Sequence, residues 1–245
     1  MARLNGSPVA KKKTLNKNNT KTPKTKRNYT ENITLRETQK LYSKSILDNT
    51  ITLCYGPAGT SKTFTACYTA LKMLLETKEI KKIILSKPIQ ESGENLGFLP
   101  GDVKEKIEPY IESYTNNIDK IIGKELRLKL EEKEIIEYRP LAYMRGGTFD
   151  DCLMILDEAQ NADMRQLMLF ITRMGKTSKA VIAGDISQYD IKINKVSLPE
   201  FVDIMGDIPG VNEIIFTEKD IVRSKILISV VKRYERWKAD NNVKY

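Results

Sequence analysis

A stretch with the composition of a phosphate-binding loop lies in the first third of the chain. It reads Gly-Pro-Ala-Gly-Thr-Ser-Lys-Thr over residues 56–63, after an apolar run at 51–55 and before a helix-like segment. A strand, a tight loop and a helix N-terminus in this order direct backbone N–H groups at an anion. Lys62 would reach the β- and γ-phosphates, and the Thr63 hydroxyl would ligate Mg²⁺. The backbone cradle would consist of Gly56, Pro57, Ala58, Gly59, Thr60 and Ser61.

One residue of this loop departs from the pattern G-x-x-x-x-G-K-[ST]. Ser61 stands where the second Gly is usual. Serine is small, but it rarely adopts a positive φ. The alternative interpretation is a glycine-containing turn with an unrelated Lys-Thr pair, and the flanking strand and helix favour the phosphate loop.

Two adjacent acids follow a continuous apolar run at residues 152–156. Such a run is typical of a strand buried on both faces, and ligands of open α/β sheets lie at the carboxyl ends of the strands. Asp157 would hold Mg²⁺, through water, and Glu158 would orient or deprotonate the attacking water. The alternative is that both acids cap the next helix. The phosphate loop upstream in the same sheet favours the catalytic interpretation.

A third motif, Gly-Asp-Ile-Ser-Gln at residues 184–188, also follows an apolar run. The Gln188 amide can donate and accept hydrogen bonds, so it could sense the γ-phosphate or its attacking water. The alternative is a polar turn after a strand.

The composition excludes several classes of chemistry. The chain has no histidine, which excludes Ser-His-Asp and Cys-His catalysis and histidine-ligated metals. Cys54, Cys67 and Cys152 are scattered without C-x-x-C spacing, so neither a zinc knuckle nor a disulfide framework is predicted. We expect proton transfer by carboxylates, Lys, Tyr or water, a hard metal ion held by oxygen, and a cytoplasmic location.

The positive charge of the chain lies at its start. The net charge is +9, residues 1–30 carry nine Lys and Arg and no acid, and the remainder has 32 basic and 32 acidic residues. This segment is also poor in large apolar residues, which predicts a disordered basic tail. It would be either a polyanion-binding arm or a solubilising leader. No apolar run suits a membrane span or a secretory signal.

Residues 31–245 are expected to form one α/β domain, a mainly parallel sheet with helices on both faces. The predicted strands are 51–55, 82–86, 134–138, 152–156, 180–183 and 211–216. The predicted helices are 34–47, 62–76, 102–130 with interruptions at Pro109 and Gly123, 164–174 and 221–237.

The three motifs, G-x-x-x-x-[GS]-K-T, D-E-A-Q and G-D-x-x-Q, resemble in this order the RecA-like core of superfamily 1 helicases. Further segments resemble the PhoH family, and the similarity extends from about Gln39 to Tyr234. These segments are Leu-Gly-Phe-Leu-Pro-Gly-Asp at 96–102 with Lys106 and Pro109-Tyr110, Ala-Tyr-Met-Arg-Gly at 142–146, Asp-Glu-Ala-Gln-Asn at 157–161, Thr-Arg-Met-Gly at 172–175 and Asp-Ile-Val-Arg at 220–223. The departures from the family pattern are Ser61 for Gly, Lys87 for Arg, Gly147 for Arg and Ser224 for His.

The resemblance implies a single RecA-like P-loop NTPase domain that binds and hydrolyses ATP with Mg²⁺. Gln39 matches the glutamine that reads the adenine edge in helicase relatives. Arg223 matches a family arginine that is a candidate arginine finger. The alternative for Arg223 is a surface arginine that pairs with Asp220 or Glu218.

The resemblance also implies partners. Because the chain has room for one RecA-like unit, either it hydrolyses ATP poorly alone or a second copy supplies the finger, and a head-to-tail ring closes such a contact. A hexamer is the expected ring, and RNA or single-stranded nucleic acid is the expected polymer. The alternatives are a P-loop kinase of a nucleoside or similar small molecule, and an ATP-gated RNA-binding module with negligible turnover. Glu158 argues against the kinase, because an acid that activates water beside Mg²⁺ promotes wasteful hydrolysis.

Overall fold

A six-stranded parallel sheet forms the centre of the protein. The computed structural model describes residues 28–88, 103–185, 197–222 and 225–241. The strand order is β3-β2-β4-β5-β1-β6, and every pair of neighbours runs parallel. The strands are β1 (Ile51–Tyr55), β2 (Lys82–Ser86), β3 (Ile136–Tyr138), β4 (Cys152–Leu156), β5 (Lys179–Gly184) and β6 (Val211–Ile215).

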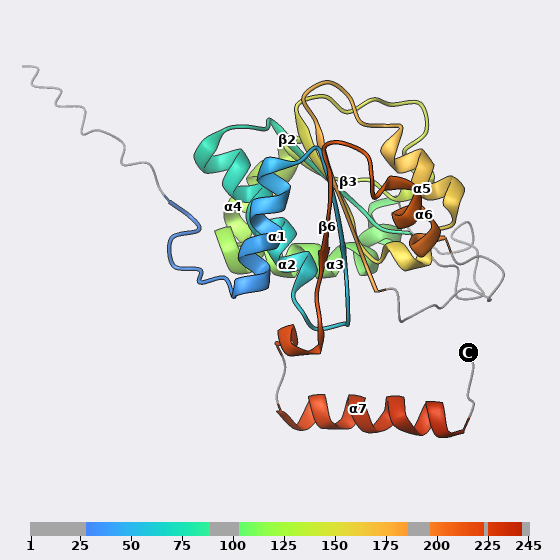
Figure 1. The fold of residues 1–245 in the computed structure, drawn as a ribbon. Coiled ribbons are helices and arrows are strands. Elements are labelled where there is room, and N and C mark those ends of the chain that lie inside the picture. The colour runs from blue at the N-terminus through green and yellow to red at the C-terminus, as the bar shows by residue number, and fades with distance from the viewer. Residues whose placement is uncertain (1–27, 89–102, 186–196, 223–224, 242–245) are drawn as a thin grey trace, which may run out of the picture.

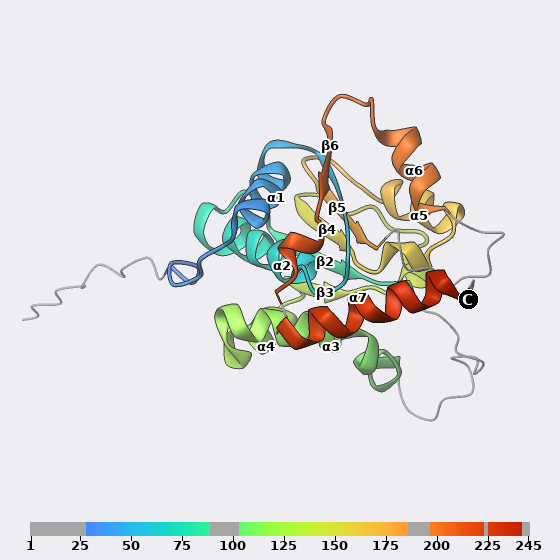
Figure 2. The ribbon, with the colours of Figure 1, turned by 60° about the horizontal axis from the view of Figure 1, so that its bottom comes forward.

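Helices cover both faces of the sheet (Figures 1 and 2). Four of them pack on one face and two on the other. The first face carries α1 (Glu37–Asp48), α2 (Lys62–Lys72), α3 (Val103–Ile122) and α4 (Lys124–Glu132). The second face carries α5 (Met164–Ile171) and α6 (Leu198–Met205). This is the RecA-like α/β arrangement that the sequence predicted.

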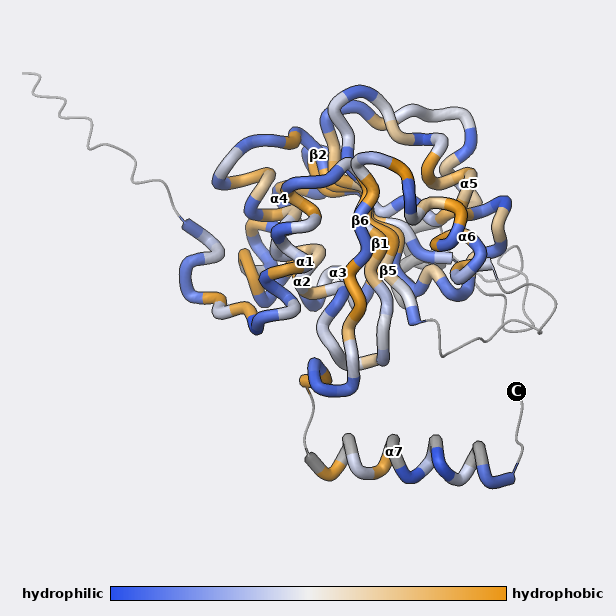
Figure 3. The backbone as a smooth tube through the Cα atoms, viewed as in Figure 1, coloured by the Kyte–Doolittle hydropathy of each residue, from blue (hydrophilic) through white to orange (hydrophobic). Residues whose placement is uncertain are grey.

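Each face has its own apolar core, because neighbouring residues of a strand point to opposite sides. In β1, Cys54 belongs to the core under α1–α4, whereas Leu53 and Tyr55 belong to the core under α5 and α6. All five residues of β1 and of β4 are buried. Figure 3 shows the hydrophobic strands β1 and β5 at the centre of the molecule. The prediction of strands buried on both faces is confirmed.

The helices depart from prediction in several places, including the start of α1 at Glu37 and the end of α5 at Ile171. α3 continues through Pro109, where an interruption was expected, and Gly123 separates it from α4 as expected. Buried Tyr114 and Ile118 anchor α3 to the core, and tertiary packing outweighs the local cost of one proline. α2 gives way to a π-helical turn at Met73–Thr77, and α7 (Lys225–Asp240) begins later than predicted. α6 was not predicted at all.

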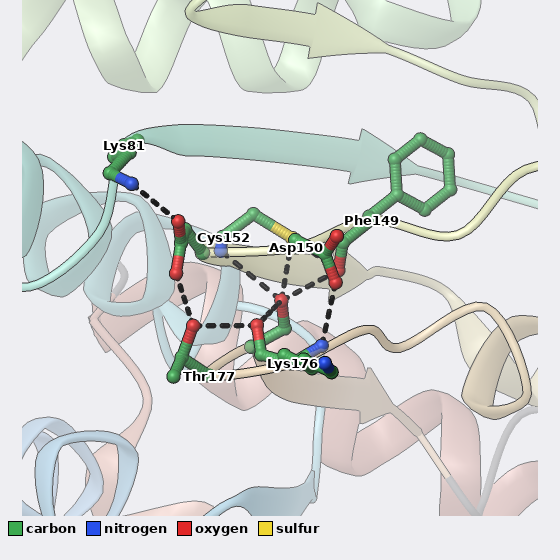
Figure 4. Close-up of polar contacts among 8 residues, drawn as sticks. Lys81, Phe149, Asp150, Cys152, Lys176 and Thr177 are labelled. Atoms are coloured by element: carbon green, nitrogen blue, oxygen red, sulfur yellow. Dashed lines mark hydrogen bonds and ion pairs between the residues drawn. The ribbon is translucent and has the colours of Figure 1, made fainter.

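The amino ends of β2, β4 and β5 are joined by polar contacts (Figure 4). The Ser178 hydroxyl donates to the Phe149 carbonyl at 2.6 Å and accepts from the Cys152 N–H at 3.2 Å. Asp151 pairs with Lys81 and accepts a hydrogen bond from the Thr177 hydroxyl. These contacts close the end of the sheet opposite the predicted site.

The two ends of the described chain differ in how they contact the domain. Thr30 is buried and bonds to Glu76 through its N–H at 3.0 Å and its hydroxyl at 2.8 Å, so folded contacts begin slightly before the predicted boundary at residue 31. Residues 1–27 of the predicted tail lie outside the described residues. At the other end, α7 stands apart from the sheet and its covering helices in Figure 1. Within the described ranges, no helix combines the length and the apolar composition that a membrane crossing requires.

Candidate nucleotide-binding site

The phosphate loop connects the carboxyl end of β1 to the first residue of α2, as predicted. Gly56 has φ 146°, and a Cβ there would lie 2.2 Å from the Phe216 carbonyl oxygen, so only glycine fits. Gly59 has φ 83°, which also favours glycine. The Thr60 hydroxyl donates to the Pro57 carbonyl at 2.9 Å and stabilises the loop from inside. Ala58 is exposed at its tip.

Ser61 adopts the left-handed conformation that the family's glycine would adopt without cost, with φ 67° and ψ 33°. It is the N-cap residue of α2, yet its side chain makes no capping hydrogen bond. Its carbonyl accepts from the Thr65 N–H at 3.0 Å and opens the helix normally. Serine at this position therefore adds backbone strain to the loop.

Lys62 and Thr63 start α2 and lie at the mouth of the loop. The Lys62 ammonium donates to the carbonyls of Gly56 at 2.6 Å and Pro57 at 3.0 Å, so it lies over the cradle itself. The Thr63 hydroxyl donates to Asp157 Oδ2 at 2.8 Å. Residues 94 positions apart in the sequence thus meet as the two motifs predicted.

The Thr63–Asp157 pair fits the protein side of a Mg²⁺ site. Both contribute hard oxygen ligands, and Mg²⁺ usually takes only one or two protein ligands beside waters and substrate phosphates. Asp157 is buried at the end of β4, and its N–H donates to the Ser86 carbonyl at 3.0 Å. The described residues hold no cluster of three or more Cys, Asp or Glu that could hold a metal ion, so waters or phosphates would complete the coordination.

Lys87 also reaches the Asp157 carboxylate, although the sequence marked this lysine only as a departure from the family's arginine. Lys87 follows β2 directly, and its ammonium lies 3.5 Å from Asp157 Oδ2 and 5.5 Å from the centre of the Tyr114 ring. The Tyr114 hydroxyl donates to the Ser86 carbonyl at 2.8 Å. Burial, with the Asp157 charge nearby, raises the pKa of Tyr114 well above its ordinary value, so it stays neutral. The sequence signal that could have placed Lys87 in the site is a cation directly after a buried strand, at its carboxyl end.

Glu158 is exposed and has a left-handed backbone, with φ 55°. Its carboxylate accepts from the Gln160 Nε2 at 2.8 Å, and Gln160 Oε1 accepts the Asp185 N–H at 2.9 Å. Gln160 therefore bridges the second motif to the first residue after β5, a link that the sequence did not reveal. Glu158 is the N-cap residue of a short 3-10 turn at Ala159–Asn161, but its side chain makes no capping hydrogen bond, and α5 is capped by Asp163. Gln188 lies outside the described residues.

The start of α1 and the segment after β6 also lie at the phosphate loop. The Thr38 hydroxyl donates to Asp220 Oδ1 at 2.6 Å, and the Val222 N–H donates to the Gly59 carbonyl at 2.8 Å. Gln39 is buried beside Thr38, and its side-chain oxygen accepts the Arg36 N–H at 2.9 Å as part of the α1 cap. The adenine role of Gln39 stays a prediction, and Arg223 lies outside the described residues.

Comparisons with known proteins agree with these motifs. Residues 33–235 match the PhoH-like protein family. A PhoH-like protein of Bacillus subtilis (strain 168) is 41% identical over 199 residues, which cover 81% of this chain and 62% of that protein. A PhoH-like protein of Mycobacterium tuberculosis (strain ATCC 25618 / H37Rv) is 42% identical over 200 residues, covering 81% of this chain and 56% of that protein. The chain therefore spans less than two thirds of the length of these relatives.

Among solved structures, the Pif1 helicase from Candida albicans matches with a TM-score of 0.40 and 16% identity, over 76% of this chain and 40% of that one. This TM-score is low, and the assignment rests on the sequence matches. Because the family match covers most of the chain and includes the phosphate loop and the acids of β4, the chain belongs to the PhoH-like protein family.

Proposed function

We propose that this chain binds ATP with Mg²⁺ and hydrolyses it. The family and the fold support a P-loop NTPase at the coarser level. One observation carries the finer proposal: the hydroxyl of Thr63 and the carboxylate of Asp157 lie 2.8 Å apart, while the ammonium of the preceding residue, Lys62, bonds to carbonyls of the phosphate loop. This arrangement offers ligands for a cation and a counter-charge for phosphates at one end of the sheet.

Catalysis would consist of positioning and charge stabilisation, since phosphoryl transfer needs little covalent work from the protein. Lys62 would exchange its carbonyl partners for the β- and γ-phosphates. Thr63 and Asp157 would hold Mg²⁺, which neutralises phosphate charge when bound. Glu158, oriented by Gln160, would accept a proton from the attacking water. Gln188 would sense the γ-phosphate.

The test of this function is phosphate release by the purified chain and by Lys62→Ala. We expect the wild type to release phosphate from ATP with Mg²⁺ and without an acceptor, and the variant to lose activity while it keeps its circular dichroism spectrum. Turnover that needs a nucleoside acceptor would support the kinase. Nucleotide-dependent RNA affinity without any hydrolysis would support the gated binding module. Unchanged hydrolysis in Lys62→Ala would reject the phosphate-loop assignment.

We propose RNA or single-stranded nucleic acid as the polymer partner. The nine cations of residues 1–30 support this, because phosphate contacts by Lys and Arg release counterions and make binding salt-dependent. Affinity for a single-stranded RNA should fall when residues 1–27 are deleted, which removes all nine cations and keeps the contacts of Thr30 with Glu76. ATPase rates should change when RNA or DNA is added. Equal affinity of both chains at low salt would reduce the tail to a leader.

We also propose a ring of identical subunits, with a hexamer as the first expectation, in which Arg223 acts on a neighbour's nucleotide. α7 supports self-association, because it exposes apolar side chains at positions four, four and three apart: Ile226, Val230, Tyr234 and Trp237. An arginine finger is worth roughly 10³–10⁵ in turnover. Mixing Arg223→Ala with Lys62→Ala should restore activity at interfaces that combine an intact loop with an intact Arg. No recovery in a mixture that exchanges subunits would contradict the role in trans.

A further inference from the structure

The buried carboxylate of Asp157 has two partners at the same oxygen. Oδ2 accepts a hydrogen bond from the Thr63 hydroxyl at 2.8 Å, and the Lys87 ammonium lies 3.5 Å from it. The Asp157 side chain is 4% exposed and that of Lys87 is 16% exposed. A charge this deep needs a counter-charge, since a neutral hydroxyl does not offset the loss of hydration. Lys87 supplies that counter-charge.

The surroundings hold Lys87 in this place. Its carbonyl accepts the Leu141 N–H at 3.4 Å, which fixes the backbone just beyond β2. The Tyr114 ring lies beside its ammonium, and the Tyr114 hydroxyl is bonded to the Ser86 carbonyl of the same strand. Lys87 is therefore placed by the strand, by α3 and by the carboxylate together, rather than by a chance surface contact.

We infer that Lys87 is a positioning residue. Its ammonium occupies the cation site at the Asp157 carboxylate, and Mg²⁺ has to displace this ammonium in order to bind there. Two cations at one carboxylate oxygen repel each other strongly in a buried site. The same ion pair that stabilises Asp157 therefore weakens its affinity for Mg²⁺ alone. Metal binding would release Lys87, so the end of β2 would change its partner when the site is loaded. The inference rests on the proposed function only in taking Asp157 as a metal ligand, and it places the metal directly on the carboxylate rather than through the water that the sequence predicted.

The test is a Mg²⁺ titration of the full chain without nucleotide. At each Mg²⁺ concentration the midpoint of thermal unfolding is measured, at constant ionic strength. Ligands that bind only the folded state raise this midpoint. Lys87→Met should be less stable than wild type in EDTA, and its apparent Mg²⁺ affinity should rise at least about tenfold, because a buried like charge is gone. Lys87→Arg keeps the charge and should keep the wild-type Mg²⁺ response.

Two controls separate the effect from general loss of an ion pair. Lys82 is the first residue of β2, at the end of the strand opposite Lys87, and it pairs with Glu137. Lys82→Met should therefore leave the Mg²⁺ response unchanged. In an Asp157→Asn background, Lys87→Met should no longer alter Mg²⁺ affinity. If Lys87→Met does not fold, Lys87→Gln, which keeps a polar chain of similar length, takes its place.

If Lys87→Met binds Mg²⁺ no more tightly than wild type, or if neither protein responds to Mg²⁺, the inference is overturned. A rise that persists in the Asp157→Asn background would overturn it too. Because this titration contains no ATP, it can fail while Lys62→Ala still abolishes hydrolysis. It can equally succeed if the chain proves to have no ATPase activity.

Discussion

The two ends of the sheet are both polar, but they satisfy their polar groups differently. At the amino end, short side chains bond to neighbouring backbone, as Ser178 does with Phe149 and Cys152 (Figure 4). At the carboxyl end, the long side chains of Lys62 and Lys87 reach acceptors that a nucleotide and its metal would replace. The amino end is closed by its own contacts, which include the exposed ion pair between Lys81 and Asp151, whereas the charges at the carboxyl end lie where a nucleotide and its metal would replace their partners.

Left-handed backbone residues occur at both ends and make the same contrast. At the amino end Asp151 (φ 50°) and Thr177 (φ 56°) are hydrogen-bonded to each other through their side chains. At the carboxyl end Ser61 belongs to the phosphate loop and Glu158 to the acidic motif after β4. Strained backbone tends to persist at functional sites, where the surroundings hold it in place. We therefore assign the strain at the amino end to turns and the strain at the carboxyl end to the site.

Among changes that compare the two ends of the sheet, the largest effect should come from Glu158→Gln. The change keeps the shape and the bond to Gln160 but removes the base, so turnover should fall by roughly 10²–10⁴ while ATP still binds. Single-turnover hydrolysis and binding of a fluorescent ATP analogue would measure the two quantities separately. A collapse of nucleotide affinity would instead make Glu158 a structural or metal-binding residue.

A change at the amino end should affect stability alone. Ser178→Ala leaves the buried Cys152 N–H without its acceptor, so the free energy of unfolding should fall by about 1–3 kcal/mol. ATP hydrolysis per folded molecule should stay at the wild-type value. Urea unfolding combined with the phosphate-release assay would check both. Lost activity in a fully folded Ser178→Ala sample would contradict the separation of the two ends.

The smallest effect should come from relieving strain in the phosphate loop. Ser61→Gly removes a left-handed serine whose side chain makes no cap, so the free energy of unfolding should rise by about 0.5–1 kcal/mol. Thr177→Gly is the matched control at the amino end, where the lost bond to Asp151 offsets the relief. An equal gain in both variants would mean that the side-chain bond at Thr177 contributes nothing.

The local pattern was enough for most of the sheet. The predicted strands 51–55, 82–86 and 152–156 agree with the structure residue by residue, because each is a short apolar run between polar residues. The helix α6 was missed, since its eight residues follow Ser197 with a proline in the first turn and too few helical repeats to stand out. The sequence predicts a break at Pro109 because helix propensity depends on neighbouring residues alone, whereas the continuity of α3 depends on its packing against the core.

The sequence by itself determined the order of the motifs and the residue types of the site. Glycine at position 56 and a lysine-threonine pair at the start of a helix are local requirements of a phosphate loop, so they are visible in one stretch of chain. Only the tertiary structure decided which groups from distant parts of the chain meet at the Asp157 carboxylate and at the Gln160 amide. Lys87 at Asp157, and Gln160 between Glu158 and Asp185, depend on the strand order that sets β4 between β2 and β5. Strand order is set by the burial of two apolar faces at once, and that is a property of the whole chain.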